Sequence, residues 1–312
     1  MLMDTQIERI YTKNGRVAQQ IAVQLLRLKK GGKLPRIDDF VRAFNVARGT
    51  IQGGLRLLEE MSAVRLESRG HLGTFLVDKD QSLLWKIADR GALVAAMPLP
   101  YSRRYEGLAT GLVQIFEEMK LPFTIAYMRG ADSRIEALRS RRIDFAIVSR
   151  WAAEKACRQY DDLFLQQSLG KKTYVEHHGV LFADWNKKKI EPGMRVGIDP
   201  SSPDQRDLTY AECEGLDVKL VEINYMQLFE QLESGQIDAA IWNLDETAGG
   251  SHWGKGRFQK EYVQNMSLSL SEAALLIRRP GEEVAQVLDA LPVQKINQIQ
   301  KEVLQGHRIP HY

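Results

Sequence analysis

The chain has 312 residues, 44% of them hydrophobic and 27% charged, with a formal net charge of +3. This length exceeds that of a usual single domain, and the apolar fraction is enough for a sizeable core, which excludes a disordered chain. No stretch is long and apolar enough to span a membrane, and the start of the chain lacks the apolar run of a signal peptide, so we expect a cytoplasmic protein without a membrane partner.

The positive charge gathers at the amino-terminal end. Residues 1–80 hold 14 Lys and Arg against 9 Asp and Glu, a net of +5, whereas the remainder has a net of −2. A basic module on a near-neutral body fits attraction to phosphates at one end of the chain. A solvated basic face explains so modest an excess equally well, so the charge alone does not decide the function.

The first predicted elements are two helices joined by a tight turn. Pro35 and the acidic pair after it mark a helix start, because the helix dipole favours negative charge in the first turn. Arg48, Gln52 and Arg56 point away from the apolar side, as in a helix whose first turn enters the major groove of DNA. The apolar residues recur at helical spacing: Phe40, Val41, Phe44, Val46, Ile51, Leu55 and Leu58.

A β-hairpin is predicted next, with strands at Val64–Ser68 and Thr74–Val77 and a basic turn between them. Helices followed by a hairpin indicate a winged helix, which we assign to residues 1–78. Its motifs resemble the amino-terminal domain of GntR-type regulators: Leu34-Pro35, Val46-x-Arg48-x-Thr50-Ile51, Leu57-Leu58-Glu59-x-Met61 and Arg69-Gly70-x-x-Gly73-Thr74-Phe75. The resemblance implies a homodimer on double-stranded DNA. The expected DNA-binding residues are Arg36, Arg48, Thr50, Gln52, Arg56, Arg69 and His71.

The second helix departs from that family at several positions. Ala47 stands where such regulators usually have a capping Ser, and its lack of a capping hydroxyl costs about 1 kcal/mol. Gly49, Gly53 and Gly54 each cost roughly 0.8–1 kcal/mol against Ala inside a helix. Gly54 is expected to allow close helix packing. Gly53 indicates close packing, a helix that becomes ordered only on DNA, or a weakened DNA binder.

Residues 79–91 are predicted to be a helical linker, because Leu83, Leu84, Trp85, Ile87 and Ala88 form an apolar set within Asp80–Arg90. An exposed apolar face is unfavourable on a monomer. The face therefore forms either a dimer contact or a packing surface against its own winged helix, and the sequence favours neither.

The body of the chain contains an internal repeat. The segment Ile135–Val148 matches Phe229–Trp242 at 7 of 14 positions, with a constant offset of 94 residues. Each copy is a helix, a polar turn and a buried strand that begins with Ile-Asp. A strand, a helix and a second strand precede each copy, so β-α-β-α-β occurs twice. This alternation predicts parallel sheets covered on both faces, arranged as two α/β lobes around one cleft.

This body, assigned to residues 92–312, looks like the type 2 periplasmic-binding-protein fold that LysR-type regulators use as an effector domain. The phrase Gly235-Gln-Ile-Asp-Ala-Ala-Ile241 carries most of that resemblance, and Arg141 replaces the glycine in the first copy. A strand at Ala274–Arg278 and two further helices are expected to complete the first lobe. Taken whole, the chain resembles the YhfZ family of transcriptional regulators. The predicted fold class is an α+β winged helix followed by a two-lobed α/β domain.

Candidate ligand-binding residues lie in the loops that follow the predicted strands. Ligands of open α/β sheets bind there, and helix starts offer free backbone N–H groups to an anion. Arg129 and Arg150 are the stronger candidates, since a guanidinium can grip a carboxylate with two hydrogen bonds. For each serine, a plain helix cap is the competing interpretation. The full set is Ser102, Arg129, Ser133, Ser149, Arg150, Ser201, Ser202, Asn224 and Tyr225.

No enzyme motif is present. The chain lacks a nucleophile elbow, a phosphate loop and a dinucleotide fingerprint, and neither cysteine has metal-site spacing. His177 and His178 are neighbours in a strand, so they point to opposite faces and cannot chelate one metal. We therefore expect a DNA-binding regulator, without cofactor or metal, that senses a small anionic effector of unknown identity. A ligand-free dimerisation scaffold is the main alternative, and a cryptic enzyme is the weaker one.

Overall fold

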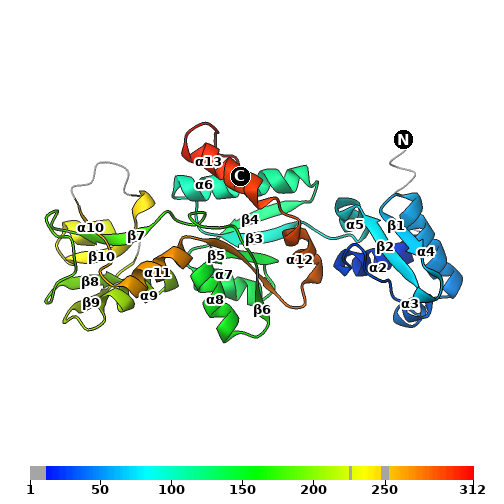
Figure 1. Ribbon diagram of the computed structural model, residues 1–312, viewed down its shortest axis with the longest axis horizontal. Coiled ribbons are helices and arrows are strands. Elements are labelled where there is room, and N and C mark those ends of the chain that lie inside the picture. The colour runs from blue at the N-terminus through cyan, green and yellow to red at the C-terminus, as the bar shows by residue number, and fades with distance from the viewer. Residues whose placement is uncertain (1–11, 225–226, 247–252) are drawn as a thin grey trace. The chain divides into compact units, whose positions relative to one another are not determined.

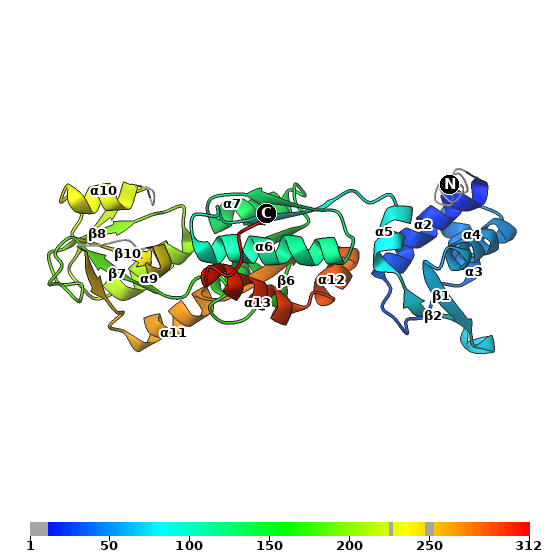
Figure 2. The same cartoon turned by 90° about the horizontal axis from the view of Figure 1, so that it is seen from above.

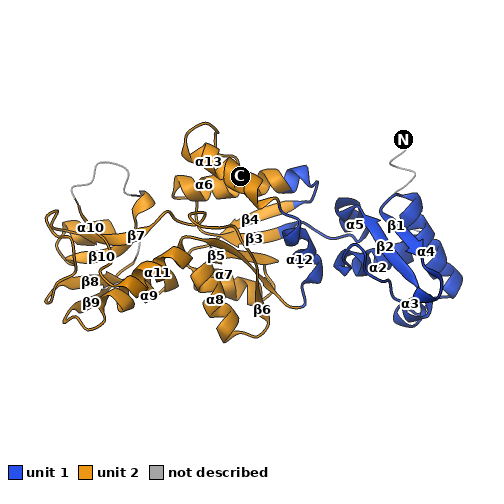
Figure 3. Ribbon diagram, viewed as in Figure 1, with its two compact units in different colours: residues 1–93, 116–122, 280–291 blue, residues 94–115, 123–279, 292–312 orange. Residues whose placement is uncertain are grey.

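The computed structural model describes residues 12–224, 227–246 and 253–312. The chain forms two compact units (Figure 3). The first unit comprises residues 1–93, 116–122 and 280–291, and the second comprises residues 94–115, 123–279 and 292–312. Across the described ranges, no helix combines the length and apolarity needed to cross a membrane.

The first unit has three helices followed by a hairpin, the arrangement of the predicted winged helix (Figure 1). Its elements are α2 (Lys13–Arg27), α3 (Ile37–Phe44), α4 (Arg48–Glu60), β1 (Val64–Ser68), the 3-10 turn η1 (Gly70–Leu72) and β2 (Thr74–Lys79). Ile21 and Leu25 of α2 are fully buried, as is Ile51 of α4. Gly54 lies where these helices cross: a Cβ there would be 3.1 Å from the backbone N of Ala18. The close packing expected of Gly54 is confirmed.

The predicted linker helix is α5 (Gln81–Ile87), and it belongs to the first unit. Asp80 caps it by accepting a hydrogen bond of 2.9 Å from the backbone N–H of Leu83. Leu84, Trp85 and Ile87 are buried, and α5 packs against α2. The apolar face is therefore covered within its own chain, which favours intramolecular packing over the dimer contact.

The second unit contains two five-stranded sheets, confirming the two predicted lobes. The first lobe has the order β4-β3-β5-β12-β6, and the second has β11-β7-β10-β8-β9. The two Ile-Asp strands, β5 and β10, lie in different sheets. The strand bounds are β3 (Leu93–Met97), β4 (Phe123–Tyr127), β5 (Phe145–Ser149), β6 (Leu163–Ser168), β7 (His178–Phe182), β8 (Arg195–Ile198), β9 (Lys219–Glu222), β10 (Ala239–Asn243), β11 (Gly254–Gly256) and β12 (Ala273–Arg278).

The sheets are mixed, whereas the sequence predicts parallel ones. The repeated β-α-β units supply the parallel pairs, β3 with β5 and β8 with β9 and β10. β12 runs antiparallel to β5 and β6, and β7 runs antiparallel to β10 and β11. The antiparallel strands come from segments where the chain passes between lobes, outside the repeat. The expectation of wholly parallel sheets was wrong for this reason.

Helices cover both sheets, and α6 packs directly on α13 (Figure 2). A Cβ on Gly107 of α6 would lie 2.9 Å from the carbonyl oxygen of Gln300 in α13, so only glycine fits there. The bounds are α6 (Arg103–Glu118), α7 (Ala131–Arg139), α8 (Arg150–Gln159), α9 (Pro203–Cys213), α10 (Leu228–Glu233), the 3-10 turn η3 (Leu244–Glu246), α11 (Glu261–Leu270) and α13 (Val293–Leu304). Helix α12 (Glu282–Asp289) belongs to the first unit instead.

The Asp of each Ile-Asp pair has the same structural task in both lobes. Asp144 accepts a hydrogen bond of 2.8 Å from the backbone N–H of Val94. Asp238 accepts one of 2.7 Å from that of Arg195, and it also pairs with the Arg195 guanidinium. Each carboxylate thus holds the start of the neighbouring strand, as expected for residues that fix the backbone rather than bind a ligand.

Candidate functional site

The first turn of α4 presents polar side chains to solvent. Arg48, Gln52 and Arg56 are exposed and Thr50 is half-buried. Ala47 is the N-cap and accepts no side-chain hydrogen bond, as predicted. The Arg48 guanidinium donates to Asp38 over 2.9 Å, but both side chains are more than 60% exposed. Such an exposed pair is weak and screened by salt, so Arg48 can exchange it for a nucleic-acid contact.

The wing carries the other predicted DNA contacts. Arg69 and His71 are exposed at its tip, and Arg36 is exposed at the N-cap of α3. The Arg69 guanidinium pairs with Glu67 at 3.0 Å and lies 4.6 Å from the centre of the Phe75 ring. Arg69 lowers the pKa of Glu67 below its usual value. These contacts orient the tip, and all seven predicted DNA residues lie on the first unit with accessible side chains.

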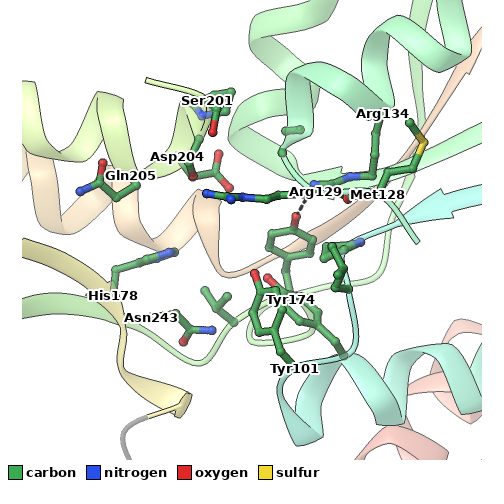
Figure 4. Close-up of a pocket in the computed structure, with 18 of the residues that line it drawn as sticks. Tyr101, Met128, Arg129, Arg134, Tyr174, His178, Ser201, Asp204, Gln205 and Asn243 are labelled. Carbon is green, nitrogen blue, oxygen red and sulfur yellow. Dashed lines mark hydrogen bonds between the residues drawn. The ribbon is translucent and has the colours of Figure 1, made fainter. Parts of the chain in front are cut away.

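A cavity of about 420 Å³ lies between the two lobes of the second unit. Figure 4 shows side chains from both lobes pointing into it. The lining is mainly apolar and aromatic, with a few polar and charged groups, which is the usual character of a small-molecule site. The polar and charged members are Arg129, Arg134, His178, Ser201, Ser202, Asp204, Gln205 and Asn243.

Arg129 bridges the lobes. It follows β4 in the first lobe, and its guanidinium donates to Asp199, which follows β8 in the second lobe, at 2.9 Å. The Arg129 side chain is 41% exposed, whereas that of Asp199 is 4% exposed. Asp199 also accepts hydrogen bonds from the backbone N–H and the hydroxyl of Ser201. Arg129 therefore already has a carboxylate partner, although part of its surface still faces the cavity.

Arg134 has a different environment, because it is 3% exposed and its contacts are to neutral oxygens. Its guanidinium donates to the carbonyl oxygen of Met128 at 2.6 Å and to the hydroxyl of Tyr174 at 2.9 Å. The Nε atom is buried and meets no acceptor in the described part of the chain. Helix α7 places this residue one turn beyond Gly130.

Asp204, in the first turn of α9, lines the cavity from the second lobe (Figure 4). It accepts a hydrogen bond of 2.8 Å from the Ser149 hydroxyl. Withdrawal from bulk water raises the pKa of Asp204 to about 6, although Ser149 and the charge of Arg134 oppose that rise.

His178, at the start of β7, is also withdrawn from water, and this lowers its pKa to about 4. Its Nδ1 atom is buried and makes no hydrogen bond within the described ranges. The ring is therefore neutral near pH 7 and offers one donor and one acceptor, not a charge.

Three tyrosines form one wall of the cavity. Tyr101 meets Tyr105 edge to face at 5.4 Å between ring centres, and Tyr105 meets Tyr174 at 5.3 Å. Tyr105 and Tyr174 are buried, whereas Tyr101 is 45% exposed. Such edge-to-face pairs favour a fixed arrangement of the rings, which gives the cavity an aromatic, apolar side.

The structure brings only part of the predicted ligand set to this cavity. Arg129, Ser201 and Ser202 line it, and Ser149 lies behind Asp204. Arg150 does not line it, and pairs with Glu154 and Glu272 instead. Ser102, Ser133 and Asn224 are not among the lining residues, and Ser102 caps α6 by accepting from the Tyr105 N–H. Tyr225 lies outside the described residues.

Sequence reasoning missed Arg134 and Asp204. Both lie near the start of a helix, and the sequence gives no sign that Arg134 is buried or that Asp204 lines a cavity. Their positions are visible in the sequence, with Arg134 four residues after Gly130 and Asp204 directly after Pro203, each following a strand. The described residues contain no cluster of three or more His, Cys, Asp or Glu side chains suited to a metal ion.

Comparison with known proteins identifies both parts of the chain. Residues 80–312 match the family described as YhfZ C-terminal domain, and residues 29–76 match a helix-turn-helix domain. An uncharacterised protein YhfZ of Escherichia coli strain K12 is 39% identical over 232 residues, which is 74% of this chain and 75% of that protein.

Two solved structures support the fold. The crystal structure of YhfZ from Shigella flexneri has a TM-score of 0.62 and 32% identity, covering 75% of this chain and 98% of that one. The periplasmic aliphatic sulphonate binding protein SsuA of Escherichia coli has a TM-score of 0.52 and 16% identity, covering 69% and 75% of the two chains. The body of the chain thus has the fold of a periplasmic binding protein.

Proposed function

Because the chain belongs to the YhfZ family and joins a helix-turn-helix domain to a binding-protein-like body, we propose that it is a transcription regulator. In this proposal a homodimer binds double-stranded DNA, and a small anionic metabolite in the cavity modulates that binding. The cavity is the observation that supports effector binding most strongly. It presents two guanidinium groups, Arg129 and Arg134, in an apolar lining.

The DNA part of the proposal is supported by the exposed first turn of α4 and by the basic wing. A selection from genomic fragments, followed by footprinting, would identify an operator. Arg48→Ala is expected to weaken operator binding by about 1–3 kcal/mol if Arg48 reads a base. An equal loss on unrelated sequences would make Arg48 a phosphate contact instead.

Arg158→Ala is a matched control for that variant, since Arg158 is an exposed arginine on α8 of the body. It removes the same charge and should leave operator affinity unchanged. Failure of the wild-type protein to protect any fragment would contradict the regulator assignment. The dimer is tested separately, by sedimentation of the protein with and without its operator.

The effector part is tested by a thermal-shift screen of small acids, sugar phosphates and amino-acid derivatives. An effector present at 100 times its dissociation constant stabilises the folded protein by about 2.7 kcal/mol. Arg129→Ala should reduce this shift, because Arg129 lines the cavity. Arg150→Ala is the control, since Arg150 lies in the same lobe but pairs with carboxylates away from the cavity.

The same screen distinguishes the alternatives. If the body serves only as a dimerisation scaffold, no compound should stabilise the protein. The thermal shifts of Arg129→Ala and Arg150→Ala would then equal that of the wild type with every compound. We propose binding rather than catalysis, so a stabilising compound should be recovered unchanged after prolonged incubation. Turnover of that compound would favour an enzyme instead.

A further inference from the structure

Two opposite charges face the cavity without forming an ion pair. The Arg134 guanidinium donates to the Met128 carbonyl and the Tyr174 hydroxyl, both neutral, and it forms no hydrogen bond or ion pair with a carboxylate of the described residues. A buried charge without a counter-ion is unfavourable, because the few hydrogen bonds around it replace water only in part. The first-lobe wall of the cavity therefore has a positive charge without a directly bound counter-ion.

Asp204 is the corresponding group on the second lobe. Its one hydrogen bond within the described chain comes from the neutral hydroxyl of Ser149, and it forms no ion pair there. The neighbouring carboxylate of Asp207, one turn further along α9, accepts from the ammonium of Lys155 at 2.6 Å instead. Asp204 is thus an unpaired acid at the cavity wall, beside a paired one that lies outside it.

The two groups are near enough to interact but are not joined. The charge of Arg134 lowers the pKa of Asp204, yet no direct contact links them. They come from different lobes, through α7 and α9, and both line the same cavity. A ligand with two complementary ends, bound in this shared cavity, would satisfy both charges.

We infer that the cavity binds a small acid whose apolar body also carries a hydrogen-bond donor, either an ammonium or a hydroxyl group. The anionic end contacts the Arg134 side of the cavity, and the donor contacts Asp204. The apolar body lies against the wall formed by Tyr101, Tyr105 and Tyr174. This inference rests on the proposed function, and it narrows the effector from acids in general to acids that bear a donor.

Matched sets of four compounds test the inference on the full-length protein. Each set shares one apolar body and comprises the 2-amino acid, the 2-hydroxy acid, the plain carboxylic acid and the plain amine. Sets built on phenylalanine, leucine and methionine cover aromatic, branched and linear bodies. In at least one set, the amino or hydroxy acid should bind about tenfold or more tightly than the plain acid and the plain amine. Comparison of the affinities of the 2-amino acid and the 2-hydroxy acid then shows whether the preferred donor is an ammonium or a hydroxyl group.

Asp204→Asn is the decisive variant, because it keeps the shape of the side chain and an oxygen for the Ser149 hydroxyl. It should remove most of the preference for the donor while leaving the affinity for the plain acid. Asp207→Asn is the matched control on the same helix and should leave the preference intact. Arg134→Gln should weaken every acid of the set, and if it does not fold, Asp204→Asn still decides the question.

Three results would overturn the inference. The plain acid could bind as tightly as the acids with donors, or Asp204→Asn could retain the full preference. In either case the cavity would still bind acids, and the proposed function would stand. Absence of any shift with every set would overturn the inference, and absence of a shift with the wider metabolite screen would also overturn the proposed effector role.

Discussion

Arg141 and Gly235 occupy matching positions in the repeated phrase, and both have left-handed backbones, with φ of 60° and 66°. Glycine adopts this conformation freely, whereas other L-residues are strained there by the contact of Cβ with the backbone. The sequence difference between the repeats is therefore not a difference in structure. The turn keeps its shape in both lobes, and the first lobe keeps it with a residue that disfavours it.

Arg141→Gly should stabilise the protein by about 1 kcal/mol, because it removes the left-handed strain. The Arg141 side chain is exposed, so its loss removes no buried contact. Gly235→Ala is the opposite substitution at the matching position of the second repeat. It should destabilise the protein by about 1 kcal/mol, because a Cβ there meets no atom within 4 Å and only backbone strain is added. Urea unfolding of both variants measures the two effects. Equal signs for the two changes would contradict this account.

Asp204 and His178 contribute to the pH dependence of the free energy of unfolding with opposite signs. Burial raises the pKa of Asp204 from 3.8 to about 6, so the folded state binds more protons than the unfolded state between these values. The free energy of unfolding therefore falls as pH rises through that window. Burial lowers the pKa of His178 from 6.5 to about 4, so this residue makes the protein less stable as pH falls through its own window.

The variant Asp204→Asn separates the contribution of Asp204 to the pH dependence of stability from that of His178. The variant should gain stability over the wild type as pH rises from about 4 to 6, and keep that advantage at pH 7.5. Thermal unfolding at half-unit pH steps measures the difference between the two proteins. The groups facing Asp204 are Ser149, Arg134, Asp132 and Asp207, all unchanged by the substitution. A difference that stays constant with pH would show that Asp204 does not titrate in this range.

For individual residues, the sequence predicted part of the cavity lining but not its two charged members Arg134 and Asp204. Loops after strands identified Arg129, Ser201 and Ser202, because sheet topology alone places such loops at one edge. The role of Arg134 depends on Tyr174, forty residues further along, which no local pattern reveals. Arg150 was chosen for its position after β5, although its i+4 partner Glu154 is visible in the sequence and already suggested a local ion pair.

At the scale of elements, the repeat was sufficient to predict two lobes. Each copy holds its own β-α-β-α-β unit, so local periodicity specified both parallel cores. The antiparallel strands β7 and β12 pair with strands distant in sequence. Their partners depend on how the chain passes between the lobes, which residue patterns do not encode. A helix, α5, lies within the predicted range Asp80–Arg90, but only the structure shows that its apolar face packs on α2.

Helix capping gives a prediction for α4. Ala47 cannot accept a hydrogen bond from the first turn, so Ala47→Ser should stabilise the protein by about 1 kcal/mol. Thr12 caps α2 by accepting from the Gly15 N–H at 3.1 Å, so Thr12→Ala should destabilise it by a similar amount. Chemical denaturation, followed by helical circular dichroism, measures both. A neutral Ala47→Ser variant would mean that another group already satisfies those N–H donors.

At the scale of the whole molecule, α12 connects parts of the chain that are far apart in sequence. It follows β12 of the body, yet it belongs to the first unit and packs against α2. Its Glu283 accepts from Arg27 at the end of α2 at 3.0 Å, and from Arg90 just after α5 at 2.9 Å. The Glu283 side chain is 15% exposed. One carboxylate therefore joins α12 to the end of α2 and to the residues that follow α5, all within the first unit.

Glu283→Gln should weaken this junction, because a neutral amide cannot neutralise two guanidinium groups. We expect a loss of about 1–2 kcal/mol, between the values for exposed and for buried pairs. Asp289→Asn is the control on the same helix: its pair with Lys29 spans 3.8 Å and is well exposed, so the change should be near zero. Hydrogen exchange should show faster opening of α12 and of the end of α2 in Glu283→Gln alone.

If an effector is found, the Glu283→Gln variant should bind it normally, and the effector should change the DNA affinity of this variant less than that of the wild type. Full transmission together with a loosened α12 would show that the signal takes a route other than this helix.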